Sequence, residues 1–360
     1  MSDTQTEKEI SVPKPASEEK VTPFYKGGLG GIEEAPYRPL LISSSPHALT
    51  DENIPKIMYS VVAALFPASA VSVYFFGLRA LMLLAVCTTA CVFTEYLLQR
   101  FSAKKITSHD GSAAITGVLL ALTLPPAFPV FGAVLGSVFA IAIGKHIFGG
   151  LGFNIFNPAL LGRAFLMATY PVLITTWTEP FASGFFGGFF GGVDAVSAAT
   201  PLANMKFEAI STPLLDLFFG NVAGSLGETS ALALLIGGLY LRYKGYINWK
   251  LPLGFLGAMA ITGGAFWLID PAKYPDPLFH VLAGGAMLGA WFMVTDMVTS
   301  PTTAPGQWIF AIGAGLITVI IRLFGGLPEG VMYSILLMNA ITPLLNRWTR
   351  PVVFGEVKAK

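Results

Sequence analysis

The chain has 360 residues, of which 54% are hydrophobic and only 12% are charged, and its mean hydropathy is +0.65. A soluble domain of this size would carry about twice that charged fraction, so the composition indicates a polytopic membrane protein lying in a lipid bilayer. The net charge of +1 argues against a nucleic-acid partner.

Apolar segments of about 17 to 22 residues follow one another through most of the chain, and they predict an all-α membrane fold with about ten transmembrane helices. The predicted segments are 56–76, 79–98, 111–126, 128–147, 157–175, 229–243, 251–269, 278–298, 306–323 and 329–347. They divide the chain into a polar tail (1–53), a first membrane half (54–175), a loop (176–228), a second membrane half (229–347) and a short tail (348–360).

Lys and Arg are distributed unevenly over the predicted loops, and this bias sets the expected orientation. With the N-terminus in the cytoplasm, the inner loops hold most of the basic residues, whereas the outer loops hold Lys206, Lys273 and a few residues at helix ends. We therefore expect both termini to be cytoplasmic and the loop 176–228 to be extracytoplasmic.

A short internal echo suggests a repeat. Phe148-Gly149-Gly150-Leu151 recurs as Phe324-Gly325-Gly326-Leu327, and a basic residue, His146 or Arg322, stands two positions before each copy. The copies are five predicted helices apart, so the two halves should have opposite orientations, as in the inverted repeats of transport folds. Chance recurrence in a chain with 39 glycines is the alternative.

Cysteine and histidine give no metal site. Cys87 and Cys91 lie four apart in an apolar helix, where they are poorly placed to form a disulfide and too few to hold an iron–sulfur cluster. We interpret them as packing residues, with half of a cluster shared with a partner protein as the other hypothesis. The four histidines do not cluster at metal-ligand spacing, and no dinucleotide fingerprint predicts an NAD site.

The most distinctive polar stretch lies in the predicted outer loop. It reads Asp194-Ala195-Val196-Ser197-Ala198-Ala199-Thr200-Pro201-Leu202, and it follows a run of only Phe and Gly, 185–192. Thr before Pro is a good helix start, with Thr200 as N-cap and Pro201 at the first helical position. Asp194 and Ser197 are typical turn residues.

Four stretches together resemble one family, the D subunit of the Rnf ion-translocating electron-transport complexes, which is related to the B subunit of the sodium-pumping NADH:quinone reductase (Nqr). They are Ser43–His47 with Lys56–Met58, Gly149–Ala159 with Gly162-Arg163, Asp194–Leu202, and Thr295-Asp296 with Thr299–Pro301 and its continuation to Asn339. Family members often have Gly where this chain has Ala198; both residues are small.

The resemblance implies a membrane flavoprotein of the bacterial inner membrane. FMN would be esterified to Thr200, Asp194 and Ser197 would be recognised by a flavin transferase, and riboflavin is a possible second, non-covalent cofactor. The protein would relay electrons within a ferredoxin:NAD oxidoreductase coupled to sodium or proton movement. Its partners would be the other Rnf subunits, especially the second flavinylated one.

Three further residues are candidates for binding a flavin. Asn154, Asn157 and Arg163 lie where the fourth and fifth predicted helices meet. Turn and cap chemistry explains both asparagines equally well. Arg163 lies inside an apolar segment, where a charge is expensive and is usually paired or functional. We expect it to pair with Asp296 or to flank a flavin or ion path. We expect Glu95 to reach the membrane interface beside Arg100, with a role in an ion path as the alternative.

Three other functions remain open: the Nqr B subunit, a solute channel or transporter without flavin, and a structural anchor for other redox subunits. The sequence does not choose the coupling ion or the direction of electron flow.

Overall fold

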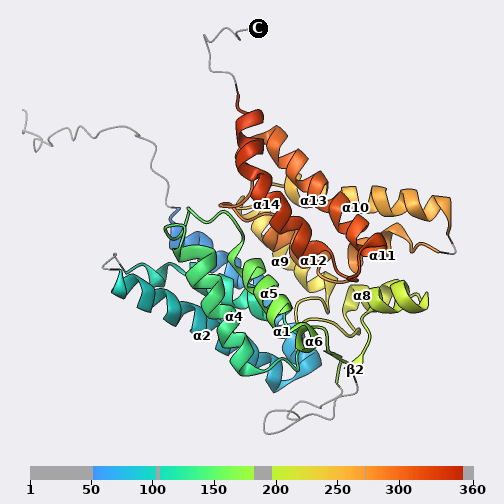
Figure 1. Cartoon of the computed structure of the whole chain (residues 1–360), viewed down its shortest axis with the longest axis horizontal. Coiled ribbons are helices and arrows are strands. Elements are labelled where there is room, and N and C mark those ends of the chain that lie inside the picture. The colour runs from blue at the N-terminus through green and yellow to red at the C-terminus, as the bar shows by residue number, and fades with distance from the viewer. Residues whose placement is uncertain (1–51, 103–105, 182–196, 272, 352–360) are drawn as a thin grey trace, which may run out of the picture. The chain divides into compact units, whose positions relative to one another are not determined.

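The computed structural model describes residues 52–102, 106–181, 197–271 and 273–351. The predicted N-terminal tail, most of the C-terminal tail, the Phe-Gly run and Asp194 lie outside the described residues. Residues Asp51–Lys360 form one compact unit. Within it, the helices of the first half, blue to green in Figure 1, lie together, as do those of the second half, yellow to red.

The described residues are mostly helical. The first half contains α1 (Ile54–Phe76), α2 (Leu78–Phe101), α3 (Ser112–Leu122), α4 (Val130–Ile141) continued by a π-helix (Ala142–His146), α5 (Pro158–Thr169) and α6 (Pro171–Ile174). The second half contains α9 (Ala231–Tyr243), α10 (Lys250–Ile269), α11 (Pro277–Leu282), α12 (Ala286–Leu288) continued by a π-helix (Gly289–Met293), α13 (Ala304–Phe324) and α14 (Val331–Trp348).

The segment between the two halves contains only short elements in its described residues. Strand β1 (Trp177–Thr178) pairs antiparallel with β2 (Ser197–Ala198), so that Trp177 lies opposite Ala198. Three short helices follow: α7 (Pro201–Ala203), a π-helix (Asn204–Glu208) and α8 (Leu214–Phe219).

All ten predicted segments contain helix, but four of the described helices, α1, α2, α10 and α13, are long and apolar enough to cross a membrane alone. The 11 residues of α3 span about 16 Å, roughly half of a ~30 Å hydrocarbon core. The single helix predicted over 278–298 is wrong, because the chain breaks between α11 and α12 and its helix ends at Met293. Ten crossings therefore stay a prediction.

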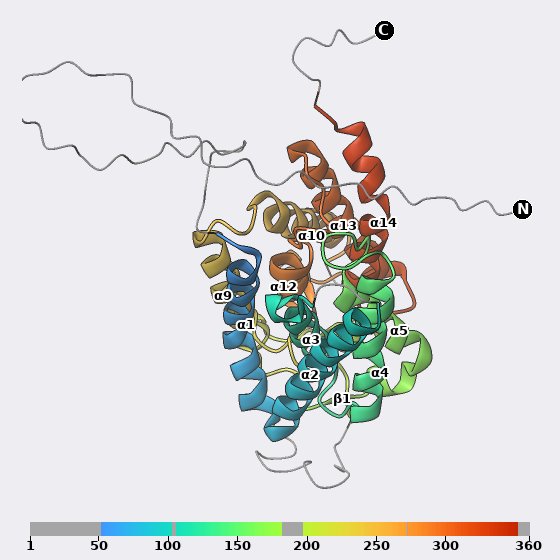
Figure 2. The ribbon, with the colours of Figure 1, turned by 90° about the vertical axis from the view of Figure 1, so that its left-hand side faces the viewer.

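The first four helices pack side by side (Figure 2). Gly77 alone separates α1 from α2, and its φ of +67° is a left-handed conformation that favours glycine. Gly117 lets α3 approach α2 closely, because a Cβ at this position would lie 2.5 Å from the Thr88 Cα.

The two halves share one packing arrangement. In the first half α2 runs parallel to α4, since Cys91 contacts Ser137 and Glu95 contacts the π-helix that continues α4. In the second half α10 runs parallel to α13, since Gly254 lies against Ala311 and Phe266 packs on Phe324. This arrangement is compatible with a repeat. However, Gly149 has a φ of +124° where its counterpart Gly325 has −73°, so the two glycine turns differ, and the inverted repeat stays a prediction.

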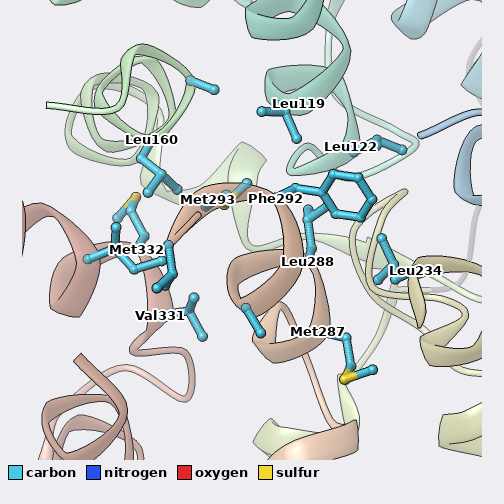
Figure 3. Close-up of a cluster of buried hydrophobic side chains, with 14 of the residues drawn as sticks. Leu119, Leu122, Leu160, Leu234, Met287, Leu288, Phe292, Met293, Val331 and Met332 are labelled. Carbon is cyan, nitrogen blue, oxygen red and sulfur yellow. The ribbon is translucent and has the colours of Figure 1, made fainter. Parts of the chain in front are cut away.

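The halves meet along α1 and α9 and through a common apolar core. A Cβ at Gly237 of α9 would lie 2.0 Å from the Ala64 carbonyl oxygen of α1, so only glycine allows this approach. Figure 3 shows leucines of α3 and α5 beside Leu288, Phe292 and Met293 of the second half. Burying apolar side chains of both halves in one cluster stabilises their association. Cys87 and Cys91 are fully buried free thiols, as the packing interpretation predicts, and a cluster shared with a partner protein stays the alternative hypothesis.

Candidate functional site

Thr200 occupies the start of α7, as the helix-start interpretation predicts. It has extended backbone angles, and its Oγ1 accepts a hydrogen bond of 3.2 Å from the Ala203 N–H. The residue is only 3% exposed. Ser197, three residues before Thr200, is fixed by its backbone pairing with Thr178. The strand pair and the cap therefore hold the peptide around Thr200 in one conformation.

A polar pocket lies against the same peptide. It has an empty volume of about 830 Å³, and Ala199, Pro201 and Asn204 form one wall. Glu179, Thr212 and Asn221 supply polar groups on the other walls. Ala199 and Pro201 flank Thr200 in sequence, whereas the buried Thr200 side chain is not itself part of the lining.

The loop around Thr200 is fastened to one end of α1. The Phe181 N–H donates a 2.8 Å hydrogen bond to the Phe75 carbonyl oxygen, and its ring packs edge-on against Tyr74. Phe181 has a φ of +61°, a strained conformation for a phenylalanine. These contacts place the Thr200 loop at the C-terminal end of α1.

Asn154 and Asn157 lie near the opposite end of α1. They line a largely apolar pocket that Ile57 and Met58, at the start of α1, also line. Helix α1 has 23 residues, a length of about 35 Å, so this pocket and Thr200 lie far apart. The Asn157 Oδ1 caps α5 by accepting from the Ala159 and Leu160 N–H groups, and Asn154 donates to the Phe156 carbonyl.

Arg163 lies at a third place and joins three elements. Its Nη2 donates to the Glu329 Oε2, just before α14, and its Nη1 lies 3.8 Å from the Glu228 Oε1, just before α9. Glu228 and Arg163 are 6% and 7% exposed. A guanidinium buried in this way needs carboxylate partners, and here both come from outside the first half.

The predicted pair of Arg163 with Asp296 is wrong. The Asp296 carboxylate accepts hydrogen bonds from the Val298 N–H and the Thr299 hydroxyl, so it organises its own turn. Asp296 instead lines the pocket that holds Asn154 and Asn157. The expected placement of Arg163 at a buried, paired position is confirmed, but its partners are two glutamates that the sequence analysis did not single out.

Glu95 forms a second buried ion pair rather than reaching the membrane interface. It is 1% exposed, and the Lys145 Nζ lies 2.7 Å from its Oε1. Lys145 also donates to the Ser112 Oγ, and Gln99 donates to the same Glu95 oxygen. The pair ties the end of α2 to the π-helix after α4, and the expectation that Glu95 snorkels beside Arg100 is therefore corrected.

A cation behind Thr200 connects its segment to the second half. The Lys206 Nζ, one helical turn beyond α7, donates to three carbonyl oxygens after or at the end of α13, those of Arg322, Gly325 and Leu327. Three carbonyls converging on one ammonium form a specific clamp, because they satisfy all of its donors. The sequence analysis did not predict this role, since it identified Lys206 only as a basic residue of the outer loop.

Comparison with known proteins identifies the family of this chain. A family model described as "NQR2, RnfD, RnfE family" matches residues 41–355. The chain is 50% identical over 325 residues to the D subunit of the proton-translocating ferredoxin:NAD(+) oxidoreductase complex of Clostridium ljungdahlii, covering 87% of this chain and 96% of the relative. It is 51% identical over 326 residues to the D subunit of the Na(+)-translocating ferredoxin:NAD(+) oxidoreductase complex of Acetobacterium woodii, covering 89% and 97%.

A more distant relative extends the same relationship. The D subunit of the ion-translocating oxidoreductase complex of Halorhodospira halophila is 37% identical over 340 residues, which cover 88% of this chain and 95% of the relative. The matches run through both membrane halves and the loop between them. This chain therefore belongs to the NQR2, RnfD, RnfE family and, within it, groups with the D subunits of Rnf complexes.

Proposed function

We propose that this chain is the membrane-embedded D subunit of an Rnf-type ferredoxin:NAD oxidoreductase and that it carries FMN on Thr200 through a phosphodiester. The main support is the relationship to the D subunits of two ferredoxin:NAD(+) oxidoreductase complexes over nearly their whole length. No NAD site is expected on this chain. Electron relay and a contribution to ion translocation are the functions we assign to it.

The environment of Thr200 suits such an attachment. In its cap, Oγ1 uses a lone pair to accept from Ala203 N, and within the described residues its hydroxyl donates no hydrogen bond. Esterification replaces the hydroxyl hydrogen and leaves an oxygen that can still accept, although more weakly. When bound, a flavin supplies one- and two-electron chemistry that the side chains lack.

The residues around the polar pocket would then position and shield the ring system. Asn204, Thr212 and Asn221 offer donors and acceptors for its polar edge. Asp194 and Ser197 would serve the flavin transferase, which recognises the peptide before the loop closes around the buried Thr200. Recognition by the transferase does not require Asp194 or Ser197 to contact the attached flavin.

The attachment is tested on a denaturing gel viewed under ultraviolet light. The full chain is produced with a flavin transferase, and a fluorescent band is expected near its mass of 38.3 kDa. Thr200→Ala should abolish the band. Thr303→Ala is the matched control, because Thr303 caps α13 with the same geometry, accepting from Gly306 N at 3.2 Å. An unmodified Thr200 peptide in mass spectra would refute the proposal.

We also propose that the apolar pocket holds the non-covalent riboflavin. Its apolar walls and its two asparagines suit a flat ring with a polar edge. The test is the amount of flavin that acid releases from the purified complex. Asn157→Asp keeps the cap acceptor but removes the amide donor, so it should lower the released riboflavin while the covalent band stays unchanged. Equal riboflavin in the variant would contradict this placement.

The coupling ion is not assigned, because the two relatives of nearly equal identity are named for different ions, protons and sodium. The electron acceptor of the intact complex distinguishes an Nqr-type from an Rnf-type function, because an Nqr-type complex would reduce a quinone rather than NAD. A plain anchor or a flavin-free transporter would give no fluorescent band.

A further inference from the structure

A separate pocket, lined in part by the segment that follows Thr200, has an unusual charge. It has an empty volume of about 550 Å³, and three cations line it: Lys206, Lys273 and Arg322. They come from the π-helix after α7, the loop before α11 and the end of α13. No Asp or Glu is among the described residues that line it.

The two inner cations have no carboxylate partner within ion-pair distance in the described part of the chain. Lys206 donates to three backbone carbonyls. The two Nη atoms of Arg322 donate to the His280 and Ala283 carbonyls, at 2.6 and 2.9 Å. Carbonyl dipoles orient these groups but do not cancel their charge. Arg322 is buried and Lys206 is half-buried. Because charges removed from water are normally paired, the pocket favours an anion.

Buried nitrogen atoms beside the pocket also need a partner. The Arg322 Nε makes no hydrogen bond in the described structure, and neither ring nitrogen of His280 does. The two residues are 3% and 1% exposed. Buried donors without an acceptor are rare in proteins. A bound oxyanion would provide acceptors for the Arg322 N–H and for a protonated nitrogen of His280.

The pocket lies among features typical of a membrane interface. Lys273 stands over the Tyr274 ring at 5.4 Å, and Tyr274 packs on Phe266 of α10. At the same ends of α10 and α13, Ile269 and Phe324 are 75% and 61% exposed. An amphipathic Lys–Tyr pair above exposed apolar side chains is the arrangement found where headgroups meet acyl chains.

We propose that this pocket binds a phosphate group and that in the membrane the group belongs to the headgroup of an anionic phospholipid. The charged walls take the phosphate, and the apolar ends of α10 and α13 lie along the acyl chains. The proposal does not depend on a flavin at Thr200, because the residues that line this pocket differ from those that line the polar pocket.

The test is native mass spectrometry of the purified, delipidated complex with added phosphatidylglycerol, phosphatidylcholine or inorganic phosphate. The wild type should retain one phosphatidylglycerol that phosphatidylcholine does not displace. Lys273→Gln should weaken this binding about fivefold, the value of one basic group near an anionic lipid, and Lys273→Arg should restore it. Lys244→Gln is the matched control: Lys244 is exposed and stands 6.0 Å from the Tyr240 ring.

Each outcome decides the proposal. Equal affinity in Lys273→Gln and wild type, or an equal loss in Lys244→Gln, would overturn it. Inorganic phosphate that binds as tightly as the lipid, with the same dependence on Lys273, would keep the phosphate site and make its source a soluble anion. If only the Thr200→Ala protein bound phosphatidylglycerol, the flavin phosphate would fill the pocket and the lipid site would be refuted.

Discussion

The buried Lys145–Glu95 pair offers the sharpest test of how the first half is held together. The two side chains are each 2% exposed, and their charged atoms lie 2.7 Å apart. In Lys145→Met, the Glu95 carboxylate would keep the Gln99 amide, at 3.2 Å, and the more distant His146 Nε2, at 3.7 Å, and the Ser112 hydroxyl would lose its donor. Removing one partner of a buried pair leaves an uncompensated charge, so we expect a loss of about 3–5 kcal/mol in the free energy of unfolding.

The second part of this prediction is recovery by a double substitution. Replacing both residues with apolar ones, as in Lys145→Met with Glu95→Leu, removes the orphaned charge and fills similar volume. Its free energy of unfolding should return to within about 1.5 kcal/mol of wild type. The two single losses should therefore add to much more than the double loss, which is the signature of direct coupling.

The assay is reversible unfolding of the full chain in mixed micelles with increasing dodecyl sulfate, followed by tryptophan fluorescence. The control pair is Lys56–Glu52, which has the same residue types and a similarly short separation, 2.8 Å, but side chains 46% and 43% exposed. Lys56→Met should leave unfolding unchanged, because exposed pairs contribute little. A small loss in Lys145→Met, or no recovery in the double variant, would show that Glu95 is neither buried nor charged as described.

Three further predictions concern packing, the clamp and a helix start. Gly237→Ala should destabilise the chain by more than about 2 kcal/mol, because its Cβ would clash with the Ala64 carbonyl. The control Gly257→Ala, whose Cβ would have nothing within 4 Å, should stabilise α10 slightly. Equal melting temperatures of the two variants would refute the close α1–α9 contact. Lys206→Met should make the segment after α7 roughly tenfold more sensitive to limited proteolysis, since it removes charged hydrogen bonds to three carbonyls; unchanged cleavage would argue against the clamp. Asn157→Ala should lower the free energy of unfolding by about 1 kcal/mol through loss of the α5 cap, and Asn157→Asp should not; a loss in both would assign the effect to the pocket.

Much of the helical framework could be predicted from the sequence, because apolar runs need helices to satisfy their backbone in a membrane. Every predicted apolar segment contains helix, and the Thr200 and Asn157 caps follow from local chemistry that the adjacent prolines mark. The break between α11 and α12 was not visible in the same way. Ala283, Gly284 and Gly285 read as part of an apolar run, and the backbone there is open because the Arg322 guanidinium replaces its helical hydrogen bonds.

The partners of buried charges were beyond sequence reasoning. Arg163 was recognisable as a paired residue, but its partner Glu329 is 166 positions away, and nothing in either local pattern identifies the other. Glu95 was expected to reach the interface beside Arg100, because no periodicity reveals that Lys145 packs against it. Such contacts depend on which helices pack together, whereas the sequence predicts only the individual helices. The cofactor assignments stay predictions for a different reason: they rest on chemistry at Thr200 that the chain alone does not perform.

The described contacts also join the Thr200 segment to the seam between the halves. Lys206 holds the turn between α13 and α14, and that turn ends at Glu329, which binds Arg163 of α5. Arg163 in turn lies beside Glu228, whose loop hydrogen-bonds to the end of α3 through Gly227 and Leu122. A displacement of the segment that follows Thr200 would therefore act first on polar contacts between the halves. If electron transfer at this loop is coupled to ion movement, these ion pairs are the contacts to examine, because Arg163 lies between two carboxylates from different segments.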